Sequence, residues 1–410
     1  MRHYLGTAFF ARLAEEGMPV AVVLLALART GDARLGALVL TAWMAPHIAA
    51  APLAGALAER VRRPVLFHAA ALGGLAVAVL TLALLTGRAP VAVVLAVALL
   101  GGGCGPVVSG GLSSLVASLA RPGRERDRAY ARDSTVYNAA SVAGPALAAS
   151  TATVAGPGAA VAGLGCSAAL AALLAAFLPA GRGTPTGSAP GAPGAQVVRR
   201  RSLGAALVAG LVAVYGVREL RAVTAATCVG FLGMGGLTTT AVLLSAERGR
   251  PGDGGLLMTA FAVGALVGSL AVDRLWPRVP AGRLVGATLL GTGVALAAAA
   301  LVPSPLVCAA LFGAAGLCDG PLLTATLRIR ADHAPAGVRT QVFTLGAGLK
   351  ISAAACGAAL TGLAAQAPPA LLLLAAAATQ FVGAALHHFL RRAPRGEIVA
   401  ASQPTGSGTG

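Results

Sequence analysis

Three ionisable side chains stand close together in an apolar stretch near the start of the chain. The stretch FARLAEEGMPVAVVLLAL contains Arg12, Glu15 and Glu16, whose spacings of three and four residues place them on one stretch of helix surface. One glutamate can neutralise Arg12, and the other carboxyl group is then free to take up and release a proton. The alternative is a purely structural network of the arginine and the glutamates. Pro19 removes the amide that would bond to the carbonyl of Glu15, so we also expect a kink there.

Lys350 is the only lysine among the 31 basic residues, and it lies in the apolar segment LGAGLKISAA. A lysine ammonium group can lose its proton when it is buried, whereas an arginine stays charged. Asp319, in the segment GLCDGPLL, is within reach of Lys350 if the two helices face each other. The two residues are therefore either a charge that is switched during function or a fixed structural ion pair.

Four further polar residues fall inside apolar segments, and each could line a substrate cavity or serve only in packing: Trp43, His47, Tyr137 and Asn138. The sequence has no phosphate-binding loop, no metal-ligand cluster and no nucleophile with a base at the spacing of hydrolases. We therefore expect no enzymatic activity, no cofactor, no metal site and no use of ATP. The six cysteines lie in apolar segments without ligand spacing, which indicates small buried residues and no disulfide framework.

The elements that position these residues must be membrane helices. Hydrophobic residues make up 57% of the chain, charged residues only 11%, and the mean hydropathy is +0.80. A soluble protein carries about 25% charged residues. Apolar runs of about 20 residues, long enough to cross the hydrocarbon core as helices, follow one another. The predicted fold class is all-α integral membrane, with twelve spans at 5–28, 35–58, 65–86, 90–119, 130–153, 157–179, 223–245, 255–273, 282–302, 304–327, 340–364 and 369–390.

The arginines between the predicted spans are distributed unevenly. Alternate loops, together with the two chain ends, hold 24 basic residues on one side of the membrane and five on the other. The positive-inside rule then predicts that both termini are cytoplasmic. This topology accounts for the net charge of +17 without nucleic acid as a partner, and anionic membrane lipids are the expected contacts of the basic side. We expect a multi-pass protein of the plasma membrane.

The longest loop divides the chain into two groups of six spans. Residues 180–195, AGRGTPTGSAPGAPGA, are rich in glycine, proline and serine and predict a flexible linker. Residues 199–222 have basic ends and a shorter apolar length than a span, and predict an interfacial amphipathic helix. The predicted organisation is a six-helix bundle over 1–179, a cytoplasmic linker over 180–222, a second bundle over 223–393 and a disordered cytoplasmic tail over 394–410.

Similar segments recur in the two groups at an offset of 213 residues. GALAERVRRP begins at Gly55 and GSLAVDRLWPR at Gly268, while GPAL at position 144 corresponds to GAAL at position 357. The same offset relates Tyr137 to Lys350. Matches at one offset indicate an internal duplication, which is typical of transporter folds built from repeats.

With six plus six spans, a long central loop and internal similarity, the chain resembles transporters of the major facilitator superfamily over essentially its whole length. The family carries a cytoplasmic signature between spans 2 and 3: a glycine, three residues, an acid, a base, any residue, a second glycine and two bases. This pattern fits with a glutamate as the acid, an arginine in place of the second glycine and a proline in place of the last base. The resemblance implies that the matching residues close the cytoplasmic side: Gly55, Glu59, Arg60 and Arg63, echoed in the second half by Gly268, Asp273 and Arg274.

The segment ASVAGPALAA at 140–149 resembles the antiporter signature of the same family, with Gly144 and Pro145 matched and alanines in place of its other glycines. The alternative is ordinary packing of small residues between helices. The resemblance implies a monomeric, proton-coupled exporter of a small organic molecule, a drug or a metabolite, that works by alternating access. An uptake symporter of the same fold, or a membrane sensor that transports nothing, would be the alternatives.

Overall fold

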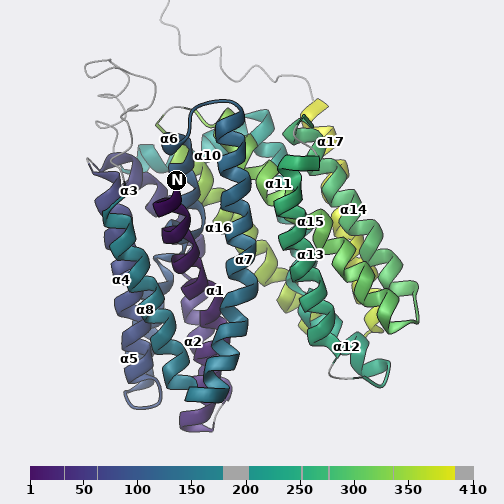
Figure 1. The fold of residues 1–410 in the computed structure, drawn as a ribbon, viewed down its shortest axis with the longest axis horizontal. Helices are drawn as coiled ribbons and strands as arrows, with labels where there is room; N and C mark the ends of the chain where they lie inside the picture. Colours follow the sequence, from purple (N-terminus) through teal and green to yellow (C-terminus); the bar gives the residue numbers. More distant parts are fainter. Residues whose placement is uncertain are drawn as a thin grey trace, which may run out of the picture.

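The computed structural model describes residues 1–31, 33–61, 63–178, 203–250, 253–275, 278–335 and 337–392, and all regular elements in these ranges are helical (Figure 1). The first bundle, called the N-bundle below, consists of α1 (Arg2–Thr30), α2 (Ala33–Met44), α3 (His47–Arg60), α4 (Pro64–Leu85), α5 (Val91–Gly102), the π-helix η1 (Val107–Gly111), α6 (Leu112–Leu119), α7 (Arg124–Ala155) and α8 (Pro157–Ala176). The second, the C-bundle, consists of α11 (Arg218–Gly235), α12 (Leu237–Glu247), α13 (Asp253–Leu275), α14 (Ala281–Leu301), α15 (Pro305–His333), α16 (Arg339–Leu363) and α17 (Pro369–Arg392). The predicted all-helical membrane fold is confirmed.

Ten segments of the described chain are long and apolar enough to cross a membrane. The charged helices α1 and α7 complete the set of twelve spans, and each span lies where hydropathy placed it. Three spans are broken into shorter helices: α2 and α3, α5 with η1 and α6, and α11 with α12. Pro46, Pro106 and Gly236 stand at the three breaks. Proline lacks the amide that continues a helix, and glycine lowers helix propensity.

The segment predicted as one interfacial helix over 199–222 differs in the structure. Helix α10 (Leu203–Gly216) ends before the extended residue Val217, and α11 begins at Arg218, so residues 218–222 belong to a span. Val214 of α10 packs with Val338 and Val342 at the start of α16. The sequence LGAALVAGLVAVYG is apolar on all sides, so it lacks the polar face that an interfacial helix needs. The predicted linker at 180–195 and the predicted tail at 394–410 lie outside the described residues.

The internal duplication is visible in the packing of equivalent helices. In the N-bundle, α7 packs against α1, where Gly144 stands against the backbone of Leu13 and Gly17. In the C-bundle, α16 packs against α11, where Gly357, at the same offset of 213, stands against the backbone of Leu232. Small residues at these crossings let the two backbones approach closely, as in other membrane helix pairs.

Large apolar side chains are exposed along the outer faces of both bundles. Examples are Val77 of α4 (66% exposed), Leu173 of α8 (64%) and Val294 of α14 (59%). Exposed apolar surface on this scale is unfavourable in water and is matched by lipid. The outer faces of the two bundles are therefore the lipid-facing surface.

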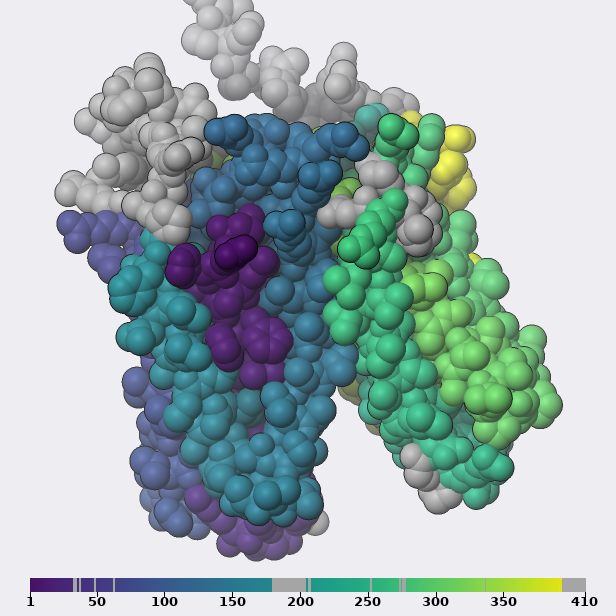
Figure 2. All heavy atoms as spheres, in the orientation of Figure 1, coloured from purple at the N-terminus to yellow at the C-terminus, as the bar shows by residue number. Residues whose placement is uncertain are grey.

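The two bundles touch at one end of the molecule and are apart at the other. We call the end that carries Met1 and Arg392 the termini end, and the opposite one the open end (Figure 1). Figure 2 shows a wide cleft between the bundles at the open end, while α3, α7 and η1 contact α13, α15 and α16 towards the termini end. Between the bundles, Lys350 of α16 stands over the ring of Tyr137 of α7, and we call this contact the cleft floor.

Candidate functional site

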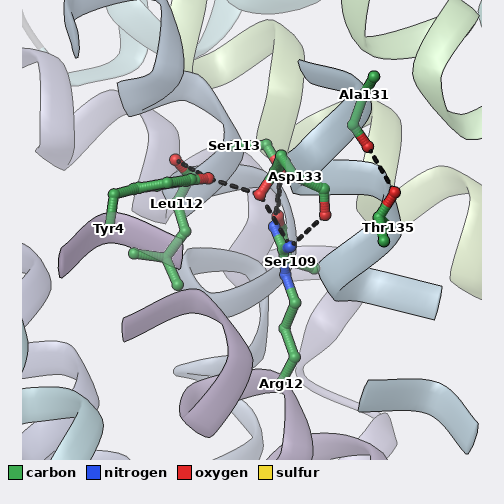
Figure 3. A network of polar contacts seen from close by, with 8 residues as sticks. All are labelled: Tyr4, Arg12, Ser109, Leu112, Ser113, Ala131, Asp133 and Thr135. Carbon is green, nitrogen blue, oxygen red and sulfur yellow. Dashed lines mark hydrogen bonds and ion pairs between the residues drawn. The ribbon is translucent and has the colours of Figure 1, made fainter. Parts of the chain in front are cut away.

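Arg12 is fully buried, and its partner is Asp133 of α7. Figure 3 shows the network: Arg12 Nη1 donates to Asp133 Oδ1 at 2.8 Å, and Arg12 Nη2 donates to Ser113 Oγ at 2.9 Å. Ser113 donates to Asp133 Oδ2 at 2.7 Å, and the Tyr4 hydroxyl donates to Asp133 Oδ1 at 2.7 Å. The network joins α1, α6 and α7 inside the N-bundle, and it gives acceptors to both terminal nitrogens of Arg12 and donors to both oxygens of Asp133.

The expected neutralisation of Arg12 by a neighbouring glutamate is therefore wrong. Local spacing favoured a partner on the same helix, but Asp133 reaches Arg12 from a helix that begins more than 100 residues later. Tyr4 and Ser113 were also missed, because neither stands out in a helix of mixed small residues. The ion pair frees both glutamates of α1 for other contacts.

Glu15 and Glu16 point to different surroundings, and both are half-buried. Glu15 Oε1 lies 3.3 Å from Nε2 of His47, at the start of α3. Glu16 lies beside Tyr137 of α7 and within electrostatic range of Lys350 in the other bundle. Sequence reasoning left the two carboxyl groups equivalent, whereas the structure gives only Glu16 a neighbour across the cleft floor.

The antiporter-like motif holds α1 in place beside Glu16. A Cβ atom at Gly144 would stand 2.8 Å from the amide nitrogen of Gly17, and Pro145 follows within α7. The backbones of the two helices touch at this point. This close approach brings the backbone of Glu16, the residue before Gly17, next to α7.

Lys350 lies between the bundles without a direct ion pair to any acid in the described ranges. Its ammonium group stands 5.6 Å from the ring centroid of Tyr137 and 4.3 Å from that of Phe231. Asp319 is within electrostatic range, but the expected direct pair between the two is not formed. On the other side of the cleft floor, the Arg12 guanidinium lies 4.9 Å from the same Tyr137 ring. Tyr137 is thus in contact with a fixed cation and with a titratable one.

Two of the remaining candidate cavity residues serve in packing or in contact between the bundles. Trp43 is 2% exposed, and its main chain and ring fill the space beside Gly101 and Gly102. Asn138 Nδ2 lies 3.4 Å from the carbonyl oxygen of Ala265 in the other bundle. Of the four polar residues chosen from the sequence, His47 and Tyr137 face the charged groups.

Glu59 connects the bundles at the termini end. Its Oε1 accepts a hydrogen bond of 2.6 Å from the amide of Thr340, in the first turn of α16. A carboxylate at a helix N-terminus satisfies a free amide and interacts favourably with the helix dipole. Gly55, one turn earlier, lies directly against Gln341 and Thr344, and a side chain there would not fit. Both residues therefore contribute to the closed termini end.

The other residues of the gate motif lie apart from this contact. Arg63 and Arg274 are exposed, and Arg60 is half-buried at the end of α3. Gly268 packs inside the C-bundle against Leu317 of α15. The side chain of Asp273 lies outside the described part of the chain.

Two charged contacts complete the closed end. Arg126 Nη2 lies 2.7 Å from Asp332 Oδ1, and Arg328 Nη2 donates to the carbonyl of Asp127 at 3.2 Å. Both contacts join the start of α7 to the end of α15. The sequence analysis counted the two arginines only for membrane topology, because arginines are abundant in every loop on this side, and it did not consider the two aspartates.

Comparison with known proteins identifies the architecture. Residues 4–249, more than half of the chain, match the model of the Major Facilitator Superfamily. The chain belongs to this superfamily. No curated protein matches it. Members of the superfamily are membrane transporters, so the expectation that the chain is not an enzyme is confirmed by its family.

Solved structures with the same fold come from transporters with different cargoes. The chain is similar to a bacterial homologue of the iron transporter ferroportin in an outward-facing state, with 16% identity, 96% of this chain and 99% of that chain covered, and a TM-score of 0.70. It is similar to the human organic anion transporter MFSD10, with 18% identity, coverage of 95% and 98%, and a TM-score of 0.67. It is also similar to the E. coli fucose:proton symporter FucP, with 13% identity, coverage of 94% and 97%, and a TM-score of 0.72.

The crossing at Gly144 gives a first prediction for this superfamily member. Gly144→Ala should force α1 and α7 apart, because the added Cβ atom would stand 2.8 Å from Gly17 N, and should lower stability by about 1–3 kcal/mol, as overpacking does. Transport should fall because Glu16 moves with α1. Gly163→Ala in α8 is the matched control, since a Cβ atom there meets nothing within 4 Å. Equal melting temperatures and equal transport rates of the two variants would contradict the prediction.

The contact of Glu59 gives a second prediction. Glu59→Ala removes the acceptor of the Thr340 amide and should slow transport about 2- to 30-fold, the factor that corresponds to the 0.5–2 kcal/mol of a helix cap. The protein should remain folded and inserted. Glu125→Ala removes an exposed glutamate at the same end and should change nothing. Initial rates that stay unchanged over a range of substrate concentrations would refute the role of Glu59.

Proposed function

We propose that the chain is a proton-coupled exporter of a small organic molecule and that Glu16 carries the proton. The observation that supports this proposal is the position of Glu16 at the cleft floor. The carboxyl group belongs to the N-bundle, lies beside Tyr137, and is within electrostatic range of Lys350 in the C-bundle. Its charge therefore acts on the relative position of the two bundles.

Protonation of Glu16 changes the attraction between the bundles. An ionised Glu16 attracts the Lys350 ammonium group across the Tyr137 ring, whereas a neutral Glu16 does not. A ligand shifts a two-state equilibrium only by its differential affinity for the two states. A proton that binds Glu16 more tightly in one facing than in the other would drive alternating access. Arg12 is unsuited to this role because it stays charged and because Asp133 and Ser113, both in its own bundle, accept its hydrogen bonds.

Two features support export by antiport. The basic side of the chain is the termini end, so the positive-inside rule places that end in the cytoplasm of a cell membrane and the cleft towards the outside. Gly144 and Pro145 match the antiporter signature at the contact that positions Glu16. In this arrangement protons would enter through the open cleft, and the monomeric carrier would release its cargo there.

The experiment that tests the proposal is transport into inside-out membrane vesicles with an imposed pH gradient. Glu16→Gln should abolish the response of transport to the gradient while the protein stays folded. Glu15→Gln, its neighbour at His47, should retain at least half of the response. The proposal is wrong if both variants respond as the parent does. Cargo that accumulates in whole cells instead of leaving them would identify an uptake symporter.

A further inference from the structure

Arg330 is a buried cation, and two of its hydrogen-bond donors have no acceptor among the described residues. It lies near the end of α15, is 3% exposed, and its guanidinium group stands against Gly346 of α16. Its Nε and Nη2 atoms have no hydrogen-bond partner in the described part of the chain, and no acid there forms an ion pair with it. An arginine cannot shed its charge, and buried charges are normally paired. Something outside the described residues is needed to satisfy this one.

Lys350 lies one helical turn beyond Gly346 on the same helix and interacts electrostatically with Arg330. It also lacks a direct ion pair among the described residues, and Asp319 of the C-bundle and Glu16 of the N-bundle are the acids within electrostatic range of it. We call Arg330, Lys350 and Asp319 the cationic cluster. With all three side chains ionised it carries one excess positive charge, and it lies in the C-bundle beside the cleft floor.

Arg12 of the N-bundle is a buried arginine with a structural role, and it can be compared with Arg330. Arg12 is equally buried and its Nε also lacks a partner in the described part of the chain, but an aspartate, a serine and a main-chain carbonyl accept hydrogen bonds from both of its terminal nitrogens. Among the described residues no such acceptor stands at Nη2 of Arg330, and this difference between the two buried arginines points to a ligand.

We propose that the C-bundle binds an anionic group of the cargo, a carboxylate or a phosphate, between Arg330 and Lys350. The proposal rests on the proposed export function and names the chemical class of its substrate. The planar fork of Arg330 suits two oxygen atoms of one such group, and Lys350, beside the rings of Tyr137 and Phe231, supplies a second charge. An anion there competes with ionised Glu16 for Lys350, so the charge of Glu16 and the occupancy of this site are linked. The headgroup of an anionic lipid offers the same oxygens, so the test separates the two sources.

The test is a melting experiment on the purified full chain in nanodiscs of phosphatidylcholine, without a pH gradient. Benzoate and phosphate serve as probes, with benzamide and with sodium chloride of equal ionic strength as controls. At about ten times the dissociation constant, at least one anion should raise the melting temperature by roughly 2 °C, and benzamide should not. Glu16→Gln should keep this shift, so that failure of the proton-carrier proposal remains distinguishable.

Arg330→Met should lose the anion-dependent shift. Without anion it should melt at a higher temperature than the parent, because an unpaired buried charge has been removed. Arg392→Met, at an exposed arginine of the same bundle, should change neither value. The proposal is overturned if no probe stabilises the parent more than sodium chloride does. It is also overturned if Arg330→Met keeps the shift or melts lower, or if only phosphatidylglycerol in the nanodisc stabilises the parent.

Discussion

Asp133→Asn is expected to lower the stability of the protein by about 3–5 kcal/mol, because it leaves the fully buried Arg12 without its counter-charge. The loss should appear as a lower melting temperature in detergent and a lower yield of folded protein. Asp332→Asn is the matched control. Its carboxylate pairs with Arg126 at 46% exposure, where an ion pair contributes about 0.2–1 kcal/mol.

A double substitution shows whether the stability lost in Asp133→Asn comes from an unpaired buried charge or from poorer packing. Arg12→Met with Asp133→Leu removes both charges and keeps apolar volume, so most of the stability lost in Asp133→Asn should return. Tyr4 keeps an acceptor in this variant, the carbonyl of Leu112 at 3.1 Å. A double variant that is no more stable than Asp133→Asn would show that the network is needed for more than charge balance. An Asp133→Asn protein as stable as the parent would refute the first prediction.

Lys350→Arg is expected to reduce transport at least tenfold while the protein inserts and folds normally. The substitution keeps a positive charge but fixes it and spreads it over a planar fork between the rings of Tyr137 and Phe231. Lys350→Met should lose transport as well. It should still fold, because the ammonium group makes no direct ion pair with Asp319. Initial rates in vesicles and the yield of monodisperse protein measure the two effects.

The control for the change of cation is Arg283→Lys, at an exposed arginine in the first turn of α14. Lys350→Met combined with Asp319→Asn should remain inactive, since the function needs the cation itself. A fixed structural pair predicts the opposite, a double variant with transport restored. Transport by Lys350→Arg at the rate of the parent would show that the single lysine has no special role.

The fold was predictable because a segment that crosses lipid must be apolar and must form a helix, and an apolar segment can be recognised from its composition. Each apolar run must satisfy its own backbone, so hydropathy placed all twelve spans and the loop arginines gave one consistent topology. Local breaks were less predictable: the division at Val217 depends on α10 packing against Val338 and Val342, and those residues come more than 100 positions later. Hydropathy indicates whether a segment lies in lipid or in water, and it says little about which other segments pack against it.

The residue types of the candidate site were predictable from the sequence, whereas the pairing of the charged residues with one another was less so. Arg12, Glu16 and Lys350 stood out because charges are rare and unfavourable inside spans. The partner of Arg12 could not be read, since two glutamates on its own helix were closer in sequence than Asp133. Arg330 was missed for the opposite reason: it belongs to a set of arginines near loops, and only the structure shows that it is buried, with Nε and Nη2 lacking a partner among the described residues.

The contacts that close the termini end also set an energy scale. Glu59 at the start of α16 and the arginine–aspartate contacts between α7 and α15 are each worth on the order of 1 kcal/mol. A tenfold difference in proton concentration across the membrane corresponds to about 1.4 kcal/mol per proton carried. The two quantities are of the same order. Under the proposed proton coupling, the free energy of one carried proton would therefore offset about one of these polar contacts, while the packing of α3 and η1 against α16 adds to the closure.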